Sequence, residues 1–210
     1  MLNEQQTRAY NILKSGKNCF ITGDAGTGKS YLINKYREYC DKNDISIMLC
    51  APTGIAAINI GGATVHRSFK MPIGPTVSNP SGIPEALKDT DVLIIDEISM
   101  LRIDNFEYVA KVIFALNKYR VKNNKRMIQV IVVGDFFQLP PVISDRDYDV
   151  LNACGYLLGS KHGYAFKSAY WGRFNFVNII LTEQMRQNNY EFIHNLSLAR
   201  IGKQQLYKLF

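Results

Sequence analysis

The sequence predicts an α/β fold in which a parallel β-sheet is covered by helices on both faces. Apolar segments of strand length alternate along the chain with segments whose apolar residues recur at helical spacing. The strand-like segments are apolar throughout rather than at every second position, which is typical of parallel strands buried on both faces. Glycine-rich and polar stretches follow several of these strands, at the edge where ligands bind in such sheets.

The individual elements follow from the local sequence. Strands are expected at residues 18–23, 45–51, 91–96, 128–134 and 176–181. Helices are expected at residues 3–15, 29–42, 53–60, 104–120 and 189–200. Asn3 is a suitable N-cap for the first helix, and Gly16 is a suitable stop.

Two segments interrupt the alternation. Residues 70–90 contain four of the seven prolines of the chain and are expected to form a loop or a small insertion. Residues 143–165 also lack periodicity and are expected to be irregular. Apart from these segments, the 210 residues are predicted to form one domain.

The composition is that of a soluble globular protein, with 47% hydrophobic and 20% charged residues. No apolar run approaches the ~18 residues that a membrane span needs, and the first residues show no secretory signal. We therefore expect no membrane partner. The four cysteines are far apart and form no Cys-x-x-Cys pair, so free thiols in a reducing, intracellular compartment are expected. That compartment is the cytoplasm for a bacterial or viral protein, and the nucleus or mitochondrion for a eukaryotic one.

The net charge of +7 is a weak sign of a polyanionic partner. Six basic residues lie in one stretch without an acidic residue: Lys111, Lys118, Arg120, Lys122, Lys125 and Arg126. This stretch either contacts a phosphate backbone or is the solvated end of a helix and the loop after it. Charge alone does not decide between these alternatives.

The stretch GDAGTGKS follows the first predicted strand and opens the second predicted helix. It matches the phosphate-loop pattern G-x-x-x-x-G-K-[ST] and comprises Gly23, Asp24, Ala25, Gly26, Thr27, Gly28, Lys29 and Ser30. The glycines let backbone N–H groups turn toward a phosphate, and the helix N-terminus adds a favourable dipole. Lys29 is expected to reach the β- and γ-phosphates of a nucleotide, and Ser30 is expected to bind Mg2+.

A pair of acids ends the third predicted strand, in the stretch DEIS. Asp96 is placed to hold Mg2+ opposite Ser30. Glu97 is placed to orient or deprotonate an attacking water. The alternative for such a pair is a helix cap.

Gln138 lies in GDFFQLPP, after the strand that is expected beside the strand of Asp96. Its amide is suited to bind a γ-phosphate or the attacking water, and to lose that bond on hydrolysis. The aromatic and proline residues around it should make the loop stiff and apolar, so that loss of the bond is transmitted as movement. Alternatively, Gln138 only satisfies backbone groups in a turn.

Five stretches occur in a fixed order: GDAGTGKS, APTGIAA, DEISML, GDFFQLPP and LTEQMRQ. With these stretches the chain resembles the Pif family of superfamily-1 DNA helicases, in the RecD-like group, from Leu2 to about Lys203. The resemblance implies a RecA-like phosphate-loop NTPase fold, with ATP and Mg2+ as cofactors and 5′-to-3′ movement on single-stranded DNA. It also implies binding to duplex junctions, in DNA repair, recombination or telomere maintenance.

The resemblance assigns two further residues to the nucleotide. Gln6, in LNEQQ, is implied as the adenine contact, which suits an amide because it offers a donor and an acceptor together. The alternative is an ordinary solvated glutamine. Arg186, in EQMRQ, is implied as an arginine directed at the γ-phosphate, since it stays charged and presents a fork of donors. The alternative for Arg186 is a surface salt bridge.

The resemblance also implies contacts to single-stranded DNA. These contacts involve Pro52, Thr53, Gly54, Thr64, His66, Ser68 and Phe69. The family pattern TIHSF reads TVHRSF here, with Arg67 inserted after the histidine. Alternatively, Phe69 is a core residue and His66 is a structural histidine. Residues 70–90 fall where relatives carry a small wedge-bearing subdomain.

Three functions compete for this sequence. The leading hypothesis is the first RecA-like motor domain of an ATP-dependent DNA helicase, with the second RecA-like domain outside residues 1–210. The second is a non-catalytic module that binds nucleotide and single-stranded DNA. The third is an unrelated phosphate-loop ATPase that remodels proteins, which the stretches GDFFQLPPV and APTGIAA disfavour. Without a second domain, the 210 residues are expected to bind nucleotide weakly and to hydrolyse ATP slowly or not at all.

Overall fold

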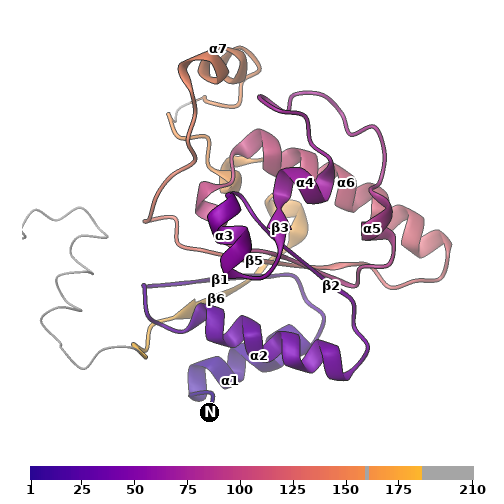
Figure 1. The fold of residues 1–210 in the computed structure, drawn as a ribbon, viewed down its shortest axis with the longest axis vertical. Coiled ribbons are helices and arrows are strands. Elements are labelled where there is room, and N and C mark those ends of the chain that lie inside the picture. Colours follow the sequence, from indigo (N-terminus) through magenta and orange to yellow (C-terminus); the bar gives the residue numbers. More distant parts are fainter. Residues whose placement is uncertain (159–160, 186–210) are drawn as a thin grey trace, which may run out of the picture.

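The computed structural model describes residues 1–158 and 161–185, so Arg186 and the helix expected at 189–200 lie outside the described residues. The described chain forms a six-stranded sheet between two layers of helices, which confirms the predicted α/β class (Figure 1). The strands are β1 (Cys19–Gly23), β2 (Ile47–Ala51), β3 (Ala63–Thr64), β4 (Val92–Ile95), β5 (Gln129–Val133) and β6 (Val177–Leu181). All pairs are parallel, in the order β3-β2-β4-β5-β1-β6. The sequence predicts every one of these strands except the two-residue β3.

The helices lie on both faces of this sheet. They are α1 (Glu4–Lys14), α2 (Lys29–Lys42), α3 (Gly54–Asn59), α4 (Val65–Phe69), α5 (Glu85–Lys88), α6 (Ile103–Lys122) and α7 (Asp145–Ala153), with 3-10 turns η1 (Ile98–Met100), η2 (Ala165–Lys167) and η3 (Gly172–Phe174). Helices α1 and α2 cover one face, and α4, α5 and α6 cover the other (Figure 1). Among the described helices, none combines the length and the hydropathy of a membrane span.

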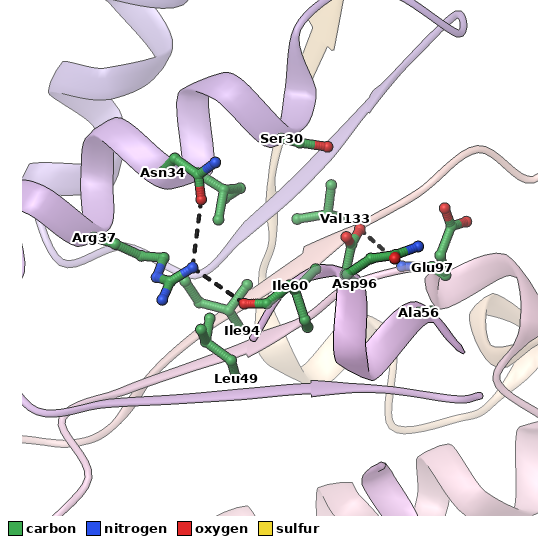
Figure 2. Close-up of a pocket in the computed structure, with 12 residues that line it drawn as sticks. Ser30, Asn34, Arg37, Leu49, Ala56, Ile60, Ile94, Asp96, Glu97 and Val133 are labelled. Atoms are coloured by element: carbon green, nitrogen blue, oxygen red, sulfur yellow. Dashed lines mark hydrogen bonds between the residues drawn. The ribbon is translucent and has the colours of Figure 1, made fainter. Parts of the chain in front are cut away.

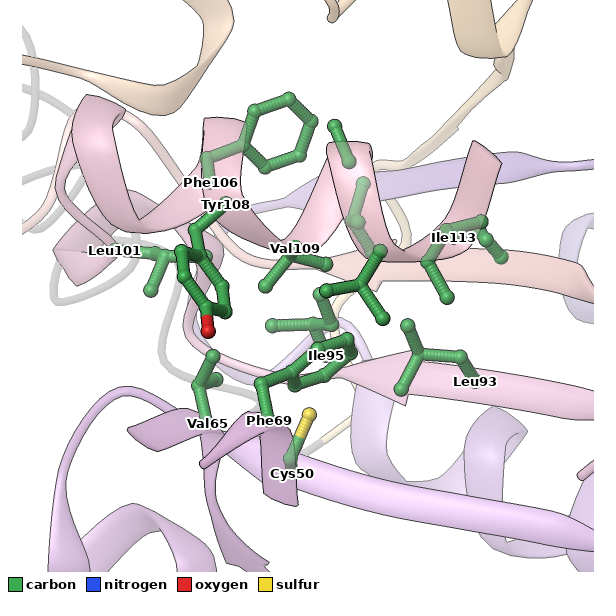
Figure 3. Packing of buried hydrophobic residues seen from close by; sticks show 14 of the residues in the cluster. Cys50, Val65, Phe69, Leu93, Ile95, Leu101, Phe106, Tyr108, Val109 and Ile113 are labelled. Carbon is green, nitrogen blue, oxygen red and sulfur yellow. The ribbon is translucent and has the colours of Figure 1, made fainter. Parts of the chain in front are cut away.

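Strand β4 shows why the strands are apolar throughout. Leu93 and Ile95 pack against the apolar face of α6 (Figure 3). The residues that alternate with them, Val92 and Ile94, pack on the opposite face of the sheet, in the cluster that includes α1 and α2. A strand covered on both faces has no solvent side, so every position is apolar.

The first helix begins and ends where the sequence predicts. The Asn3 side chain accepts a hydrogen bond from Gln6 N at 2.7 Å, and the Gln6 side chain accepts one from Asn3 N at 3.2 Å. This reciprocal pair is a capping box. Gly16 follows the C-cap with φ +75°, a left-handed conformation that favours glycine after a helix.

The expectation that residues 143–165 are irregular is wrong, because α7 forms within them. Ser144 is its N-cap and accepts from Asp147 N at 3.2 Å. Within α7, Leu151 is the single buried residue. The helix therefore has no apolar stripe by which its sequence could be recognised. Residues 70–90 form the expected loop, interrupted by the one-turn α5.

Most of the basic stretch is exposed, which is compatible with both of its predicted alternatives. Its exposed members include Lys118, Lys122, Lys125 and Arg126. Arg120 differs, because it is buried and donates to the Asp91 carboxylate and to three backbone carbonyls. Arg120 is therefore a structural residue and not a candidate contact for a phosphate backbone.

Three of the cysteines, Cys19, Cys40 and Cys50, are buried free thiols, as expected. Burial raises the pKa of Cys19 to about 11. The neutral thiol is thus favoured, and a neutral buried thiol is unreactive. Cys154 is free and exposed.

Candidate functional site

The phosphate loop lies between the end of β1 and the start of α2. At Gly23, β6 approaches so closely that the Leu181 carbonyl oxygen would clash with any Cβ atom. Gly28 is the N-cap of α2, has φ +81°, and faces the Gln6 side chain. Close approach and left-handed backbone thus require glycine at both positions. The stretch GDAGTGKS therefore has the strand-to-helix turn that a phosphate loop needs.

Lys29 is held by the loop from which it emerges. Its Nζ donates to the carbonyl oxygens of Gly23 at 2.8 Å and Asp24 at 3.0 Å. Thr27 is buried, and its hydroxyl also donates to Asp24 O, at 2.9 Å. These bonds close the turn and keep the ammonium group next to the backbone that is predicted to cradle a phosphate.

Asp96 and Glu97 follow β4 at the same edge of the sheet. Figure 2 shows both at one end of a cavity of about 170 Å3 that Ser30 also lines. Burial raises the pKa of Asp96, an effect opposed by the Glu97 backbone N–H at 2.9 Å and by the Lys29 ammonium. Burial also raises the pKa of Glu97, and the charges of Asp96 and Asp135 raise it further, against the effect of Lys29. The loop lysine and the two acids therefore form one electrostatic group.

The backbone of Glu97 is in an unusual conformation. Its φ of +52° and ψ of +43° lie in the left-handed region, which residues other than glycine rarely adopt. Glu97 precedes η1, but its side chain makes no capping hydrogen bond there, so the helix-cap alternative does not hold. A strained backbone together with a raised carboxyl pKa is typical of a functional carboxylate. A raised pKa also makes Glu97 a better proton acceptor for water.

The residues present fit a magnesium ion. The Ser30 hydroxyl and the Asp96 carboxylate line the same cavity, and both are oxygen donors of the kind that Mg2+ prefers. Within residues 1–158 and 161–185, no group of three or more His, Cys, Asp and Glu side chains forms a preassembled metal site. A magnesium ion here would thus share its coordination with nucleotide phosphates and water, as is usual for this ion.

Gln138 follows β5, which pairs with β4 as the sequence predicts. Its backbone N–H donates to Asp135 O at 2.9 Å, and its Nε2 donates to Asp135 Oδ2 at 3.3 Å. Asp135 is itself buried and accepts a further bond from Phe137 N at 3.1 Å. The Gln138 amide is therefore tethered to a buried carboxylate. Sequence analysis missed Asp135, although it is an acid that directly follows an apolar strand segment, as Asp96 is.

The loop that carries Gln138 is only partly as stiff and apolar as expected. Phe136 packs against the rings of Phe20 and Trp171. Phe137, by contrast, is 63% exposed, so its ring does not anchor the loop to the core. The anchored part of the loop is therefore the part nearest β5.

Gln6 lies beside the phosphate loop, but it is buried. Its Oε1 accepts from Asn3 N within the capping box, and its Nε2 donates to Thr27 O at 3.4 Å. The amide thus joins α1 to the loop and is not presented to an adenine base in this conformation, and the solvated-glutamine alternative is also wrong. The open side of the loop instead leads to a cavity of about 460 Å3, which sequence analysis missed. Apart from the loop and the start of α2, which includes Tyr31, its lining consists of Met1 and Met185.

Three of the predicted strand contacts lie together. Pro52, Thr53 and His66 line a separate cavity of about 220 Å3. The Thr53 hydroxyl also caps α3, accepting from Ala56 N at 3.2 Å. Gly54, the first residue of α3, is exposed. These residues share one surface, as a strand-binding site requires.

The other predicted strand contacts belong to α4 and its cap. The Thr64 hydroxyl accepts from Arg67 N at 3.2 Å, and Ser68 is partly exposed. Phe69 is 1% exposed and packs in the core near Val65 (Figure 3). Stacking of the Phe69 ring on a base is therefore a wrong prediction, because the ring faces the core.

His66 is half-buried, and its Nε2 lies 3.5 Å from Asn105 Nδ2. Burial lowers the pKa of His66, the positive charge of Arg102 lowers it further, and Asp104 opposes both. The imidazole is therefore neutral at pH 7. It offers hydrogen bonds, rather than charge, to a ligand in the cavity.

Known proteins share this arrangement of motifs. The family profile described as PIF1-like helicase matches residues 1–197. The chain belongs to the PIF1-like helicase family. The matched residues include the phosphate loop, the acids after β4 and the loop after β5.

Relatives of this PIF1-like chain are named helicases. The ATP-dependent DNA helicase Pif1 of Psychrobacter sp. (strain PRwf-1) is 36% identical over 197 residues, which cover 89% of this chain and 28% of that protein. Pif1 of Campylobacter jejuni is 36% identical over 199 residues, which cover 88% of this chain and 41% of that protein. The structure of Pif1 helicase from Bacteroides in complex with ADP-AlF3 and ssDNA has a TM-score of 0.80 and 31% identity, covering 97% of this chain and 47% of that one. The chain thus spans less than half the length of these relatives.

Proposed function

We propose that this PIF1-like chain is the first RecA-like domain of an ATP-dependent DNA helicase that moves 5′-to-3′ on single-stranded DNA. In this proposal, ATP and Mg2+ bind at the phosphate loop, and a second RecA-like domain of the same protein closes over the nucleotide. Named relatives support the proposal, since they are ATP-dependent DNA helicases. Solved Pif1 complexes with ADP-AlF3 and ssDNA, and with forked dsDNA, support nucleotide, single strands and junctions as ligands.

One observation carries the proposal. Ser30, Asp96 and Glu97 line the same cavity, and the Lys29 charge acts on both acids. Lys29 and Ser30 follow the end of β1 at Gly23, and the two acids follow the end of β4 at Ile95. These strand ends are 72 residues apart in the sequence, and the parallel sheet brings them to one edge. A cation, a hydroxyl and two carboxylates at one sheet edge are the groups that phosphoryl transfer from ATP requires.

Each residue then has a defined task. Lys29 would bind the β- and γ-phosphate oxygens, and Ser30 and Asp96 would hold Mg2+, which supplies positive charge against those oxygens when bound. Glu97 would orient the attacking water and accept its proton. Gln138 would bind the water or the γ-phosphate, and its bond to Asp135 defines the resting position of the amide.

Unwinding by a protein that carries both motor domains tests this function. We expect such a protein to hydrolyse ATP in the presence of single-stranded DNA and to unwind a duplex with a 5′ tail, but not one with a 3′ tail. The 210-residue chain alone is expected to bind fluorescent ATP and to turn over slowly. Unwinding that prefers a 3′ tail would contradict the polarity, and vigorous turnover by the isolated chain would contradict the need for a second domain.

The alternative, a non-catalytic module that binds nucleotide and single-stranded DNA, predicts another result. The two-domain protein would then bind both ligands without DNA-stimulated hydrolysis. A Glu97→Gln variant separates the cases, since it should remove turnover from an enzyme and change nothing measurable in a module that never hydrolyses ATP.

A further inference from the structure

Arg102 lies between the cavity of predicted strand contacts and helix α7. It is the N-cap residue of α6 and is 8% exposed. It lines the 220 Å3 cavity together with Pro52, Thr53 and His66. Arg102 lies outside the nucleotide site and outside the predicted strand-contact motifs.

The Arg102 guanidinium has two carboxylate partners that differ in mobility. Asp104 is completely buried, accepts two bonds from Arg102 at 2.7 and 2.8 Å, and accepts another from Thr76 N at 2.7 Å. Asp147 accepts one bond from Arg102 Nη1 at 2.7 Å, and its side chain is 20% exposed. Asp104 is thus a fixed partner. Asp147 is the exchangeable partner, because the free-energy cost of opening an ion pair is smaller when its carboxylate is in contact with water.

Asp147 belongs to an element that is lightly attached. It lies in the first turn of α7, where Leu151 is the single buried residue. Figure 1 shows α7 at the top of the molecule, away from the sheet. A segment with few buried apolar contacts is displaced at low cost.

The charges of this cluster favour an exchange. One arginine and two aspartates sum to a net charge of −1, so a DNA phosphate that approached the cavity would be repelled while Asp147 stayed in place. If the phosphate replaced Asp147, Arg102 would stay paired and the repulsion would be relieved. A guanidinium is suited to either partner, because its fork of donors matches carboxylate and phosphate alike.

We propose that Arg102 binds a phosphodiester group of single-stranded DNA and that Asp147 stays paired with Arg102 until the strand displaces it. This inference rests on the proposed function, because it adds a phosphate contact and a control element to the same strand site. Displacement frees α7, which follows the loop that carries Gln138. Strand binding would thus change the position of the loop that carries Gln138, next to the nucleotide site.

Asp147→Asn and Asp149→Asn form a matched pair for the test. Both remove one negative charge from α7, but Asp149 is exposed and has no role in the proposal. The probe is a fluorescein-labelled oligothymidylate, and the readout is the dissociation constant from fluorescence anisotropy across a range of salt concentrations. Asp147→Asn should bind about tenfold more tightly than Asp149→Asn, because the strand no longer competes with an intramolecular anion.

The salt dependence gives a second readout. In the wild type and in Asp147→Asn the same Arg102 neutralises the same strand phosphate. The two slopes of log affinity against log salt should therefore be equal, and the gain in affinity should persist across the salt range. Arg102→Lys tests the other partner: combined with Asp147→Asn, it should remove most of the gain, since lysine lacks the fork. Thermal melts establish that each variant is folded.

The outcomes separate the two proposals. Equal affinities for Asp147→Asn and Asp149→Asn would overturn this inference, while strand binding by the wild type would still support the proposed function. A gain that persists with Arg102→Lys would show that Arg102 is not the phosphate contact. Failure of the folded wild type to bind the oligonucleotide would overturn both proposals.

Discussion

Helix α6 has a buried arginine at each end, and the two arginines have opposite surroundings. Arg120, in its last turn, donates to three backbone carbonyls and to one carboxylate. Arg102, at its N-cap, donates to two carboxylates and to one backbone carbonyl. The carbonyls bound by Arg120 cannot leave without unfolding the chain around them, whereas one carboxylate bound by Arg102 lies on the exposed α7.

The difference follows the two edges of the sheet. Arg120 binds Thr90 and Arg126, which lie just before β4 and β5, at the edge opposite the phosphate loop. Arg102 lies after β4, at the edge that also carries Lys29 and Asp96. One arginine of α6, Arg120, thus stabilises the fold at one edge of the sheet. The other, Arg102, is placed to bind a ligand at the opposite edge.

Replacing Arg120 should have the largest effect on stability. Arg120→Ala leaves buried backbone carbonyls without donors, so we expect the free energy of unfolding to fall by about 3 kcal/mol in urea denaturation. The nucleotide and strand affinities of the folded variant should stay unchanged. Lys118→Ala, an exposed neighbour on the same helix, is the control. Comparable losses for the two variants would contradict a structural role for Arg120.

At the opposite edge, Glu97→Gln should abolish hydrolysis but stabilise the domain. Burial and neighbouring acids raise the pKa of Glu97, so its ionised form destabilises the folded state at pH 7. We expect the variant to gain about 1 kcal/mol in the free energy of unfolding at that pH. The gain should shrink as the pH falls through the raised pKa toward the ordinary value of 4.5.

Melting curves of wild type and Glu97→Gln over this pH range measure the effect. In the wild type, proton uptake by the folded state restores the missing stability as the pH is lowered, so the two curves should converge. A variant less stable than the wild type at pH 7, or an advantage that persists at low pH, would show that Glu97 is not destabilised by its surroundings.

The smallest effect is expected for the exposed part of the basic stretch. Lys125 pairs with Asp89 at 3.1 Å, and both side chains are solvated. Because exposed ion pairs contribute little, Lys125→Ala should leave both the free energy of unfolding and the strand affinity within experimental error. A clear loss of salt-dependent strand binding in Lys125→Ala would instead place the DNA site near the Arg120 edge of the sheet.

Local patterns made most of the fold and the centre of the site predictable. The strands were recognisable because burial on both faces makes each of them apolar throughout, as in β4. The phosphate loop was recognisable because the backbone itself requires glycine at Gly23 and Gly28. The meeting of Lys29 with Asp96 and Glu97 then followed from the rule that parallel strands align their carboxyl ends.

The remaining features depend on contacts that no local pattern encodes. Arg102 and Asp147 are 45 residues apart, and α7 itself lacks an apolar stripe. Gln6 has the sequence position of a base contact, but the capping box and the phosphate loop together occupy its amide. Phe69 lies within a strand-contact motif, yet α4 directs its ring into the core. In each case the neighbours in space decide the role.

Nucleotide titration of Lys29→Ala tests the central claim most directly. The claim is that the phosphate loop and the two acids form one site for ATP with magnesium. Affinity for fluorescent ATP should fall by about 100-fold in Lys29→Ala, because a charge-assisted contact to the phosphates is lost. Lys35→Ala, on the exposed side of the same helix, should bind as the wild type does. An unchanged affinity in a Lys29→Ala variant with a native melting curve would contradict the claim.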